Sequence, residues 1–223
     1  MTISQTLKDR ISIRAYLDRP VSREDVKDLL DAARFAPSGG NLQPWRVHVV
    51  MGASRERLIA HVKKAIQDNP ATDQSEISVY PKGLKDPWRA RRSEVAEDMY
   101  ALLNIPRDDK LARLMNLARN FEFFGAPVGL FFSIDRQFDK NQWAHLGMFM
   151  QSLALLATER GMGTCMQEAW TRYAKQVSTF LELPDHEQLY CGMSLGYPDM
   201  QAPVNHLRST RIEVDSFTTF LDE

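Results

Sequence analysis

The residue types best suited to binding chemistry gather first in a short segment near the N-terminus. There, polar and apolar residues alternate over Arg10, Ile11, Ser12, Ile13 and Arg14. In an extended chain this spacing directs the two arginines and the serine to one side and the isoleucines to the other. Arginine donates paired, charge-assisted hydrogen bonds to phosphate oxygens, so the segment suits a phosphate. A solvated polar face opposite two buried isoleucines fits the same pattern equally well.

A second segment, Ala-Pro-Ser-Gly-Gly-Asn-Leu-Gln-Pro-Trp at residues 36–45, cannot form regular structure. Its prolines lack N–H donors, and its adjacent glycines tolerate positive φ. Ser38, Asn41 and Gln43 both donate and accept hydrogen bonds, which suits a neutral polar ligand such as a heterocycle edge or a sugar-like chain. An ordinary helix-to-strand connection is the alternative.

The C-terminal region returns to basic residues, because Arg208 and Arg211 lie in the turn-rich segment 206–212. A frayed basic end would explain them. Combined with the two N-terminal segments, however, they complete a set of groups suited to a phosphorylated, partly neutral, planar cofactor.

Helices and strands alternate along the chain and must position these segments. Hydrophobic periodicity predicts a helix at 22–34, with Ser22 as N-cap and Asp25 completing a capping box. With few hairpin signals, the pattern favours an α/β layer arrangement. The other predicted helices are 55–67, 93–103, 107–124, 142–160 and 173–181, and the predicted strands are 46–51, 126–134, part of 161–170, and 188–198, of which 46–51 is expected to be buried.

Two further stretches bear on the site and on assembly. Residues 69–92 form a long irregular connection with Tyr80 and Trp88, as in a lid or a binding loop, or else a simple surface excursion. The helix at 142–160 is apolar nearly all round, which favours burial between subunits.

Composition narrows the function classes. Of 223 residues, 28 are Lys or Arg and 29 are Asp or Glu, so charge gives no broad reason to expect nucleic acid or a membrane as partner. Cys165 and Cys191 have no paired spacing and are expected to be reduced and buried, without zinc. No targeting segment is recognisable, so a cytoplasmic location is expected.

Five motifs occur in a characteristic order over nearly the whole chain. They are Arg10-x-Ser12-x-Arg14, Ala36-Pro37-Ser38-x-x-Asn41-x-Gln43-Pro44-Trp45, Gly161-x-Gly163-Thr164-Cys165, Gly192-x-x-x-Gly196-Tyr197-Pro198 and Arg211. Together they resemble the FMN-dependent nitroreductase family. The resemblance implies an α+β fold, an α/β/α sandwich whose mixed sheet is flanked by helices. It also implies an intertwined homodimer with one domain, residues 1–223, in which residues 69–124 form a lid and helices over the active site.

The same resemblance assigns roles to residues. Hydride would pass from NADPH or NADH to flavin N5 and then, by a ping-pong mechanism, to a nitroaromatic or quinone acceptor in one pocket. No side chain need act as nucleophile or obligatory acid, although Glu168 or the Ala169 backbone could assist. No metal is expected. The cofactor-binding residues would be Arg10, Ile11, Ser12, Arg14, Arg208 and Arg211 around the phosphate, Pro37, Ser38, Gly39 and Asn41 from the other subunit, and Gln167, Glu168 and Ala169 near N5. Flat surface for the acceptor would come from Tyr80, Trp88, Phe123 and Phe124.

Alternatives stay open within and beyond this chemistry. Reductive dehalogenation, enone reduction and flavin fragmentation occur in the same superfamily. The iodotyrosine-dehalogenating pattern is not matched, because Ala96 precedes Tyr100 and Asn120 stands where a lysine is expected. A non-catalytic flavin-binding dimer is a further alternative. Ile212 and Glu213 follow Arg211 in place of a frequent proline, which leaves the register of the last phosphate contact open.

Overall fold

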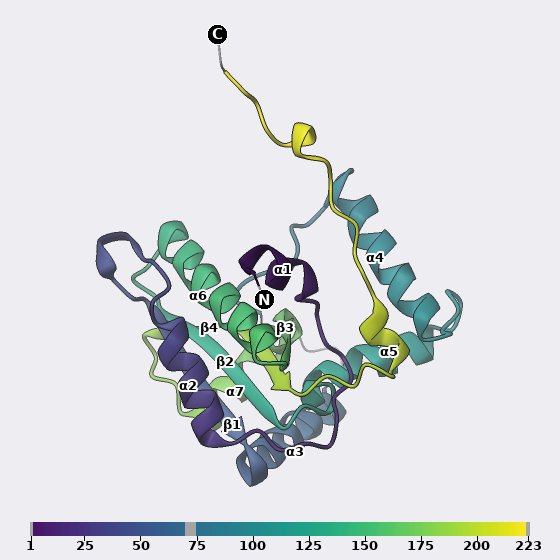
Figure 1. Cartoon of the computed structure of the whole chain (residues 1–223). Helices are drawn as coiled ribbons and strands as arrows, with labels where there is room; N and C mark the ends of the chain where they lie inside the picture. Colours follow the sequence, from purple (N-terminus) through teal and green to yellow (C-terminus); the bar gives the residue numbers. More distant parts are fainter. Residues whose placement is uncertain (1, 70–74, 222–223) are drawn as a thin grey trace.

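The computed structural model in Figure 1 describes residues 2–69 and 75–221. Its helices are α1 (Ile3–Asp9), α2 (Arg23–Ala33), α3 (Gly52–Asp68), α4 (Trp88–Leu102), α5 (Lys110–Ala118), α6 (Lys140–Glu159) and α7 (Ala174–Leu181). Its strands are β1 (Trp45–Met51), β2 (Val128–Asp135), β3 (Gly163–Gln167) and β4 (Glu187–Gly196). Short 3-10 turns include η1 (Gly39–Asn41), η2 (Arg119–Gly125), η3 (Glu168–Tyr173) and η4 (Pro203–His206).

The strands form one sheet in the order β1-β2-β4-β3, with antiparallel pairing between all neighbours. The N-terminal segment joins the sheet at two isolated bridges, Ser12 with Thr164 in parallel and Tyr16 with Pro198 in antiparallel orientation. The predicted α+β class is therefore confirmed. Within the described residues, the mixed character of the sheet is confined to the bridge at Ser12.

Helices cover both faces of the sheet, which confirms the α/β/α layering (Figure 1). Alternate side chains of β2, from Val128 to Ile134, pack with α2 and α6 in one core, whereas Phe131 faces α3 and α7 in the other. Alternation with period two thus supplies both cores from one strand. The predicted capping box of Ser22 and Asp25 is present at the start of α2.

Two strand glycines allow large rings to lie directly on the sheet. A Cβ at Gly129 would lie 2.2 Å from the ring of Phe123, and a Cβ at Gly192 would lie 2.3 Å from the ring of Trp170. The sheet surface is therefore shaped for these aromatic side chains at both positions.

The acceptor-binding prediction for Phe123 and Phe124 is wrong. Their exposed fractions are 0% and 4%, so neither ring offers surface to a ligand. The helix predicted over 107–124 ends at Ala118, and positive φ values of 54° and 55° at the two phenylalanines turn the chain toward the core. Burial of these rings outweighs the local cost of left-handed backbone.

Two other expectations differ in detail. The first strand, β1, lies at the sheet edge, so Val50 alone among its residues is fully buried. The helix predicted from residue 93 begins at Trp88, which therefore belongs to α4 and not to the irregular connection. Residues 70–74 of that connection lie outside the described part. Both cysteines are free and buried, as predicted.

No helix in residues 2–69 or 75–221 is long and apolar enough to cross a membrane.

Candidate functional site

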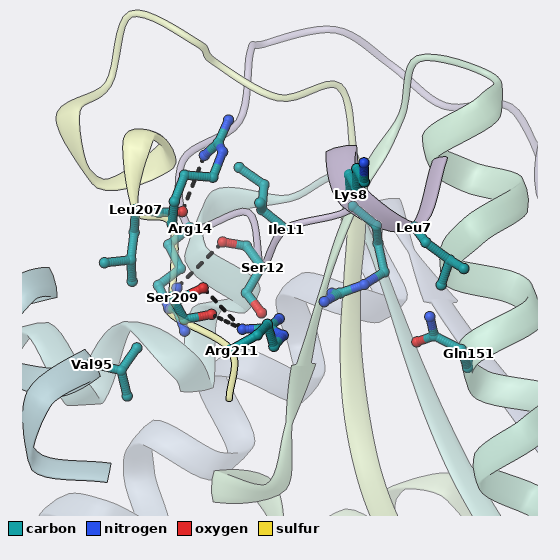
Figure 2. A pocket seen from close by; sticks show the side chains of 12 residues that line it. Leu7, Lys8, Ile11, Ser12, Arg14, Val95, Gln151, Leu207, Ser209 and Arg211 are labelled. Atoms are coloured by element: carbon teal, nitrogen blue, oxygen red, sulfur yellow. Dashed lines mark hydrogen bonds between the residues drawn. The ribbon is translucent and has the colours of Figure 1, made fainter. Parts of the chain in front are cut away.

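Basic side chains from both ends of the chain share one cleft of about 590 Å³. It lies between α1, α6, α4 and the C-terminal segment, and in Figure 2 Ser12, Ser209 and Arg211 approach one another there, with Val95 and Gln151 on opposite sides. Within the described chain, no Asp or Glu lines it. The lining residues are Leu7, Lys8, Arg10, Ile11, Ser12, Arg14, Val95, Gln151, Leu207, Arg208, Ser209 and Arg211. All six residues predicted at the phosphate are thus brought together.

Ile13 anchors the N-terminal segment to β3. Its side chain is buried, and its N–H donates to the carbonyl oxygen of Thr164 at 2.9 Å. A Cβ at Gly163 would lie only 2.4 Å from Cγ1 of Ile13, so the glycine provides the space in which the isoleucine sits. With Ile13 fixed, the period of two directs Ser12 and Arg14 toward the cleft. Ile11, expected to be a second anchor, is half-buried and lines the cleft instead.

Asn205 in η4, which sequence reasoning missed, ties the two chain ends together. Its fully buried amide accepts a hydrogen bond from the N–H of Arg14 at 2.8 Å and donates to the carbonyl oxygens of Ala15 and Asp199, each at 2.8 Å. Arg208 donates to the carbonyl oxygen of Asn205 at 3.1 Å. Because asparagine in a polar tail is usually exposed, no sequence signal distinguished this position.

The cleft concentrates positive charge without internal compensation. Burial lowers the pKa of Arg10, and the nearby guanidinium of Arg211 lowers it further. Arg14 and Arg211 donate to backbone or serine oxygens through Nη1, and none of their other guanidinium nitrogens bonds to a described residue. A phosphate placed here would receive charge-assisted hydrogen bonds and relieve the repulsion between guanidinium groups. The cleft therefore fits a phosphorylated ligand.

The Ser38–Gly39–Gly40–Asn41 turn lies elsewhere. It borders a second pocket, of about 510 Å³, over the N-terminal half of α6, where Gly39 faces His145. None of the predicted loop residues lines the basic cleft, and Figure 1 shows the loop after α2 well away from α4 and the C-terminal segment. Within one chain, the two halves of the predicted cofactor site are thus separate.

The predicted N5 segment begins at Gln167, the last residue of β3, and also lies outside the lining of the basic cleft. The Gln167 side chain is buried, donating to the carbonyl oxygen of Asn120 at 2.9 Å and accepting from the Trp170 indole at 3.4 Å, so only its backbone is available to a ligand. Glu168 is half-buried, and burial raises the pKa of its carboxyl group. Cofactor contact by Gln167, Glu168 and Ala169 remains a prediction.

Tyr80 lines a third pocket, of about 550 Å³, between α4 and the C-terminal segment. The guanidinium of Arg92 lies over its ring, 4.4 Å from the centroid. This pocket shares Val95, Ser209 and Arg211 with the basic cleft, so the two are contiguous. Trp88 is exposed at the start of α4 and does not line this pocket.

Known proteins resemble the chain over nearly its whole length. A model described as "Nitroreductase family" matches residues 7–197. The chain is 38% identical to "Nitrobenzene nitroreductase" of Ectopseudomonas oleovorans, over 99% of this chain and 97% of that protein. It is 40% identical to "4-nitrobenzoate reductase" of Pseudomonas putida, over 95% and 92%.

Solved structures show the same fold. The FMN and NADPH-dependent nitroreductase NfnB from Sphigopyxis sp. strain HMH superposes with a TM-score of 0.97 and 39% identity, covering all of both chains. The FMN-dependent nitroreductase NfnB from Mycobacterium smegmatis in complex with NADPH gives a TM-score of 0.90 and 29% identity, covering 98% of this chain and 97% of that one.

Proposed function

The chain belongs to the nitroreductase family, and from this premise we propose that it is an FMN-dependent oxidoreductase that reduces nitroaromatic compounds with hydride from NAD(P)H. The observation that carries the proposal is the basic cleft, in which arginines from both ends of the chain converge with no carboxylate among the described lining residues. Similar proteins named for nitrobenzene and 4-nitrobenzoate support the acceptor class.

Residues of the cleft would hold the FMN phosphate. Arg10, Arg14 and Arg211 supply the guanidinium groups, Ser12 adds a hydroxyl, and Arg208 is a neighbouring helper. When bound, FMN supplies the ring that accepts and then donates hydride. The chain contributes binding and orientation, and no nucleophile–base pair is needed for that task. Solvent can supply the protons that the reduced product requires.

The acceptor is proposed to bind beside Tyr80. The exposed ring of Tyr80 and the contiguity of its pocket with the basic cleft place aromatic surface next to the proposed phosphate site. Flat aromatic compounds stack on such surfaces. For Trp88 to contact the same ligand, the start of α4 would have to reach it. Residues 69–124 are proposed to cover the active site.

The separation of the two half-sites supports a homodimer. The loop borders the N-terminal half of α6, whereas Gln151, further along α6, lines the basic cleft. Between them α6 exposes Ala144, Gly147 and Met148, and a Cβ at Gly147 would meet nothing within 4 Å. If α6 of two copies crossed about a two-fold axis at this face, the loop of one copy would approach the cleft of the other.

Other exposed apolar residues favour intertwining of the two copies. Leu111 and Leu114 on α5 are 68% and 60% exposed, and Phe217 and Phe220 in the C-terminal segment are 65% and 69% exposed. That segment runs beside α4 and then leaves the body of the molecule (Figure 1). Apolar surface of this extent is typical of a protein interface. The cytoplasmic location stays a prediction.

Reconstitution tests the function. Purified protein mixed with FMN should show a bound-flavin spectrum and sediment as a dimer. With oxygen excluded, it should then oxidise about one equivalent of NADPH or NADH per flavin on its own, and continue to turn over only when a nitroaromatic such as 4-nitrobenzoate is present. A protein that fails to retain added FMN would overturn the proposal. Tight FMN without reduction by either nicotinamide would show a flavin-binding protein that is not an enzyme of this kind.

A further inference from the structure

A single imidazole supports the turn at residues 38–41. The backbone N–H of Gly39 donates to Nε2 of His145 at 3.2 Å. The ring lies directly against the turn, because a Cβ at Gly39 would be 3.1 Å from Cε1 of His145. Helix α6 thus presents the histidine to the turn from a rigid element.

The turn is strained and needs such support. Gly40, Asn41 and Gln43 all have positive φ, at 59°, 55° and 47°. Two of these are not glycine, so the surrounding structure must hold them in a sparsely populated conformation. Inside the turn, Ser38 accepts from the N–H groups of Asn41 and Gln43 at 2.9 and 3.0 Å. Across the described residues, His145 is the one side chain from another element that forms a hydrogen bond with residues 37–44.

This hydrogen bond specifies the protonation state of the ring. Nε2 accepts, so it carries no proton, and in the neutral ring the proton must be on Nδ1. The Nδ1 atom is buried and has no hydrogen-bond partner among the described residues. Protonation of the ring adds a hydrogen to Nε2, so that two donors, Nε2–H and the Gly39 N–H, would point at each other. The supported turn therefore requires neutral His145.

The described residues place no charged neighbour beside the ring in its own pocket. The turn and α6 contribute Gly39, Gly40, Leu42, Asn141, Gln142, Ala144 and Met148 to that lining, all uncharged. Among the elements that pack on α6, α2 carries Asp31 and Arg34 toward this end, and these two form an ion pair with each other. Arg46 of β1 donates to the carbonyl oxygen of Trp45. The first residue of α6 is Lys140, and the carboxylate of its N-cap, Asp139, takes part in the capping box.

We propose that His145 is a positioning residue that holds the turn at residues 38–41 in its FMN-binding shape, and that this support is lost when the imidazole is protonated. The inference rests on the proposed function, in which the turn contacts the flavin bound by the other copy. The histidine itself needs no contact with the flavin, because it acts through the Gly39 amide. FMN affinity should then depend on a hydrogen bond that is remote from the phosphate.

The experiment compares two variants at His145 in the full-length protein. His145→Gln retains a side-chain acceptor that does not titrate, whereas His145→Leu removes the acceptor. FMN dissociation constants are measured by flavin fluorescence between pH 5.5 and 8, with circular dichroism and sedimentation checking fold and assembly. The matched control is His61→Gln, a substitution of an exposed histidine on α3.

At pH 8, His145→Leu should bind FMN about tenfold more weakly than the native protein, as expected for loss of one positioned hydrogen bond. His145→Gln should remain within about threefold. Between pH 8 and pH 5.5 the native protein should lose affinity relative to His145→Gln, because only the imidazole can take up a proton. The ratio of the native dissociation constant to that of His145→Gln at each pH cancels the titration of the FMN phosphate itself. The His61→Gln protein should follow the native profile.

Outcomes separate this inference from the proposed function. If the native protein does not bind FMN, the proposed function fails. If it binds FMN but His145→Leu matches it throughout, the positioning role is wrong. If His145→Leu does not fold, the ratio of FMN dissociation constants between the native protein and His145→Gln decides. A ratio that does not change with pH refutes the inference.

Discussion

Replacing Gly163 by alanine should displace the N-terminal arginine segment without touching any arginine. The added Cβ would lie 2.4 Å from Cγ1 of Ile13, and ordinary carbon contacts are near 3.5–4.0 Å. Ile13 must therefore move by roughly 1–1.5 Å, since overlap of this size cannot be absorbed in place. We expect a loss of about 1–3 kcal/mol in the free energy of unfolding from overpacking.

The same shift should weaken FMN binding. Ser12 and Arg14 flank Ile13, and the bridge of Ser12 to Thr164 depends on the same close approach. Misplacing one or two charge-assisted hydrogen bonds should reduce FMN affinity by roughly 10- to 100-fold. Urea denaturation and FMN fluorescence titration measure the two effects separately.

A double variant isolates the cause. Ile13→Ala alone should destabilise the chain by about 2–5 kcal/mol, because it empties a buried site. Combined with Gly163→Ala, it removes the atom that the new Cβ strikes. The double variant should then be more stable than the sum of the single effects predicts. Additive losses, or native FMN affinity in Gly163→Ala, would refute the proposed packing of Ile13 on Gly163.

Other parts of the site give three further predictions. Arg14→Ala should weaken FMN binding by about 1.5–3 kcal/mol while leaving riboflavin affinity unchanged, because it deletes a phosphate contact; titration with both ligands checks this, and equal losses would exclude a phosphate role. Asn205→Ala should lower the free energy of unfolding by about 2–4 kcal/mol and weaken FMN binding as well, because the Arg14 N–H and two carbonyl groups lose their buried partner. Urea denaturation checks this against Asn69→Ala, a change at an exposed asparagine that follows α3. Equal stabilities of the two variants would contradict the prediction. Burial raises the pKa of Glu168 above its ordinary value of 4.5, so folding favours the protonated carboxyl, and stability from this group is lost as pH rises through the raised pKa. Glu168→Gln should therefore be more stable than the native chain at pH 7, by roughly a few tenths of a kcal/mol after solvent screening. Denaturation measurements below about pH 4 should no longer show this difference in stability.

Local patterns predicted well which N-terminal residues line the basic cleft. Alternation at Arg10, Ser12 and Arg14 needs only an extended backbone to place the side chains together, and β3 supplies one through Thr164. Arg208 and Arg211 were grouped with the N-terminal segment by residue type, and the family resemblance supported the grouping. Contact between residues so distant in sequence has no local signature.

Tertiary packing determined what local patterns missed. Apolar residues at helical spacing continue up to Phe123 and Phe124, which predicts a helix there. Instead, both rings are buried, with Phe123 against Gly129 and Trp170, and their burial imposes a tight left-handed turn. Asn205 has the composition of an exposed tail and becomes a buried link only because the two chain ends meet. Neither outcome follows from periodicity, since each requires the position of a distant residue.

The central claim is that guanidinium groups from both chain ends hold the FMN phosphate. Calorimetric titration of the native protein with FMN and with riboflavin tests it most directly, because the two ligands differ only in that phosphate. We predict that FMN binds at least about 100-fold more tightly, as two charge-assisted contacts would give, and that this preference shrinks at high salt. Equal affinities for the two flavins would contradict the claim.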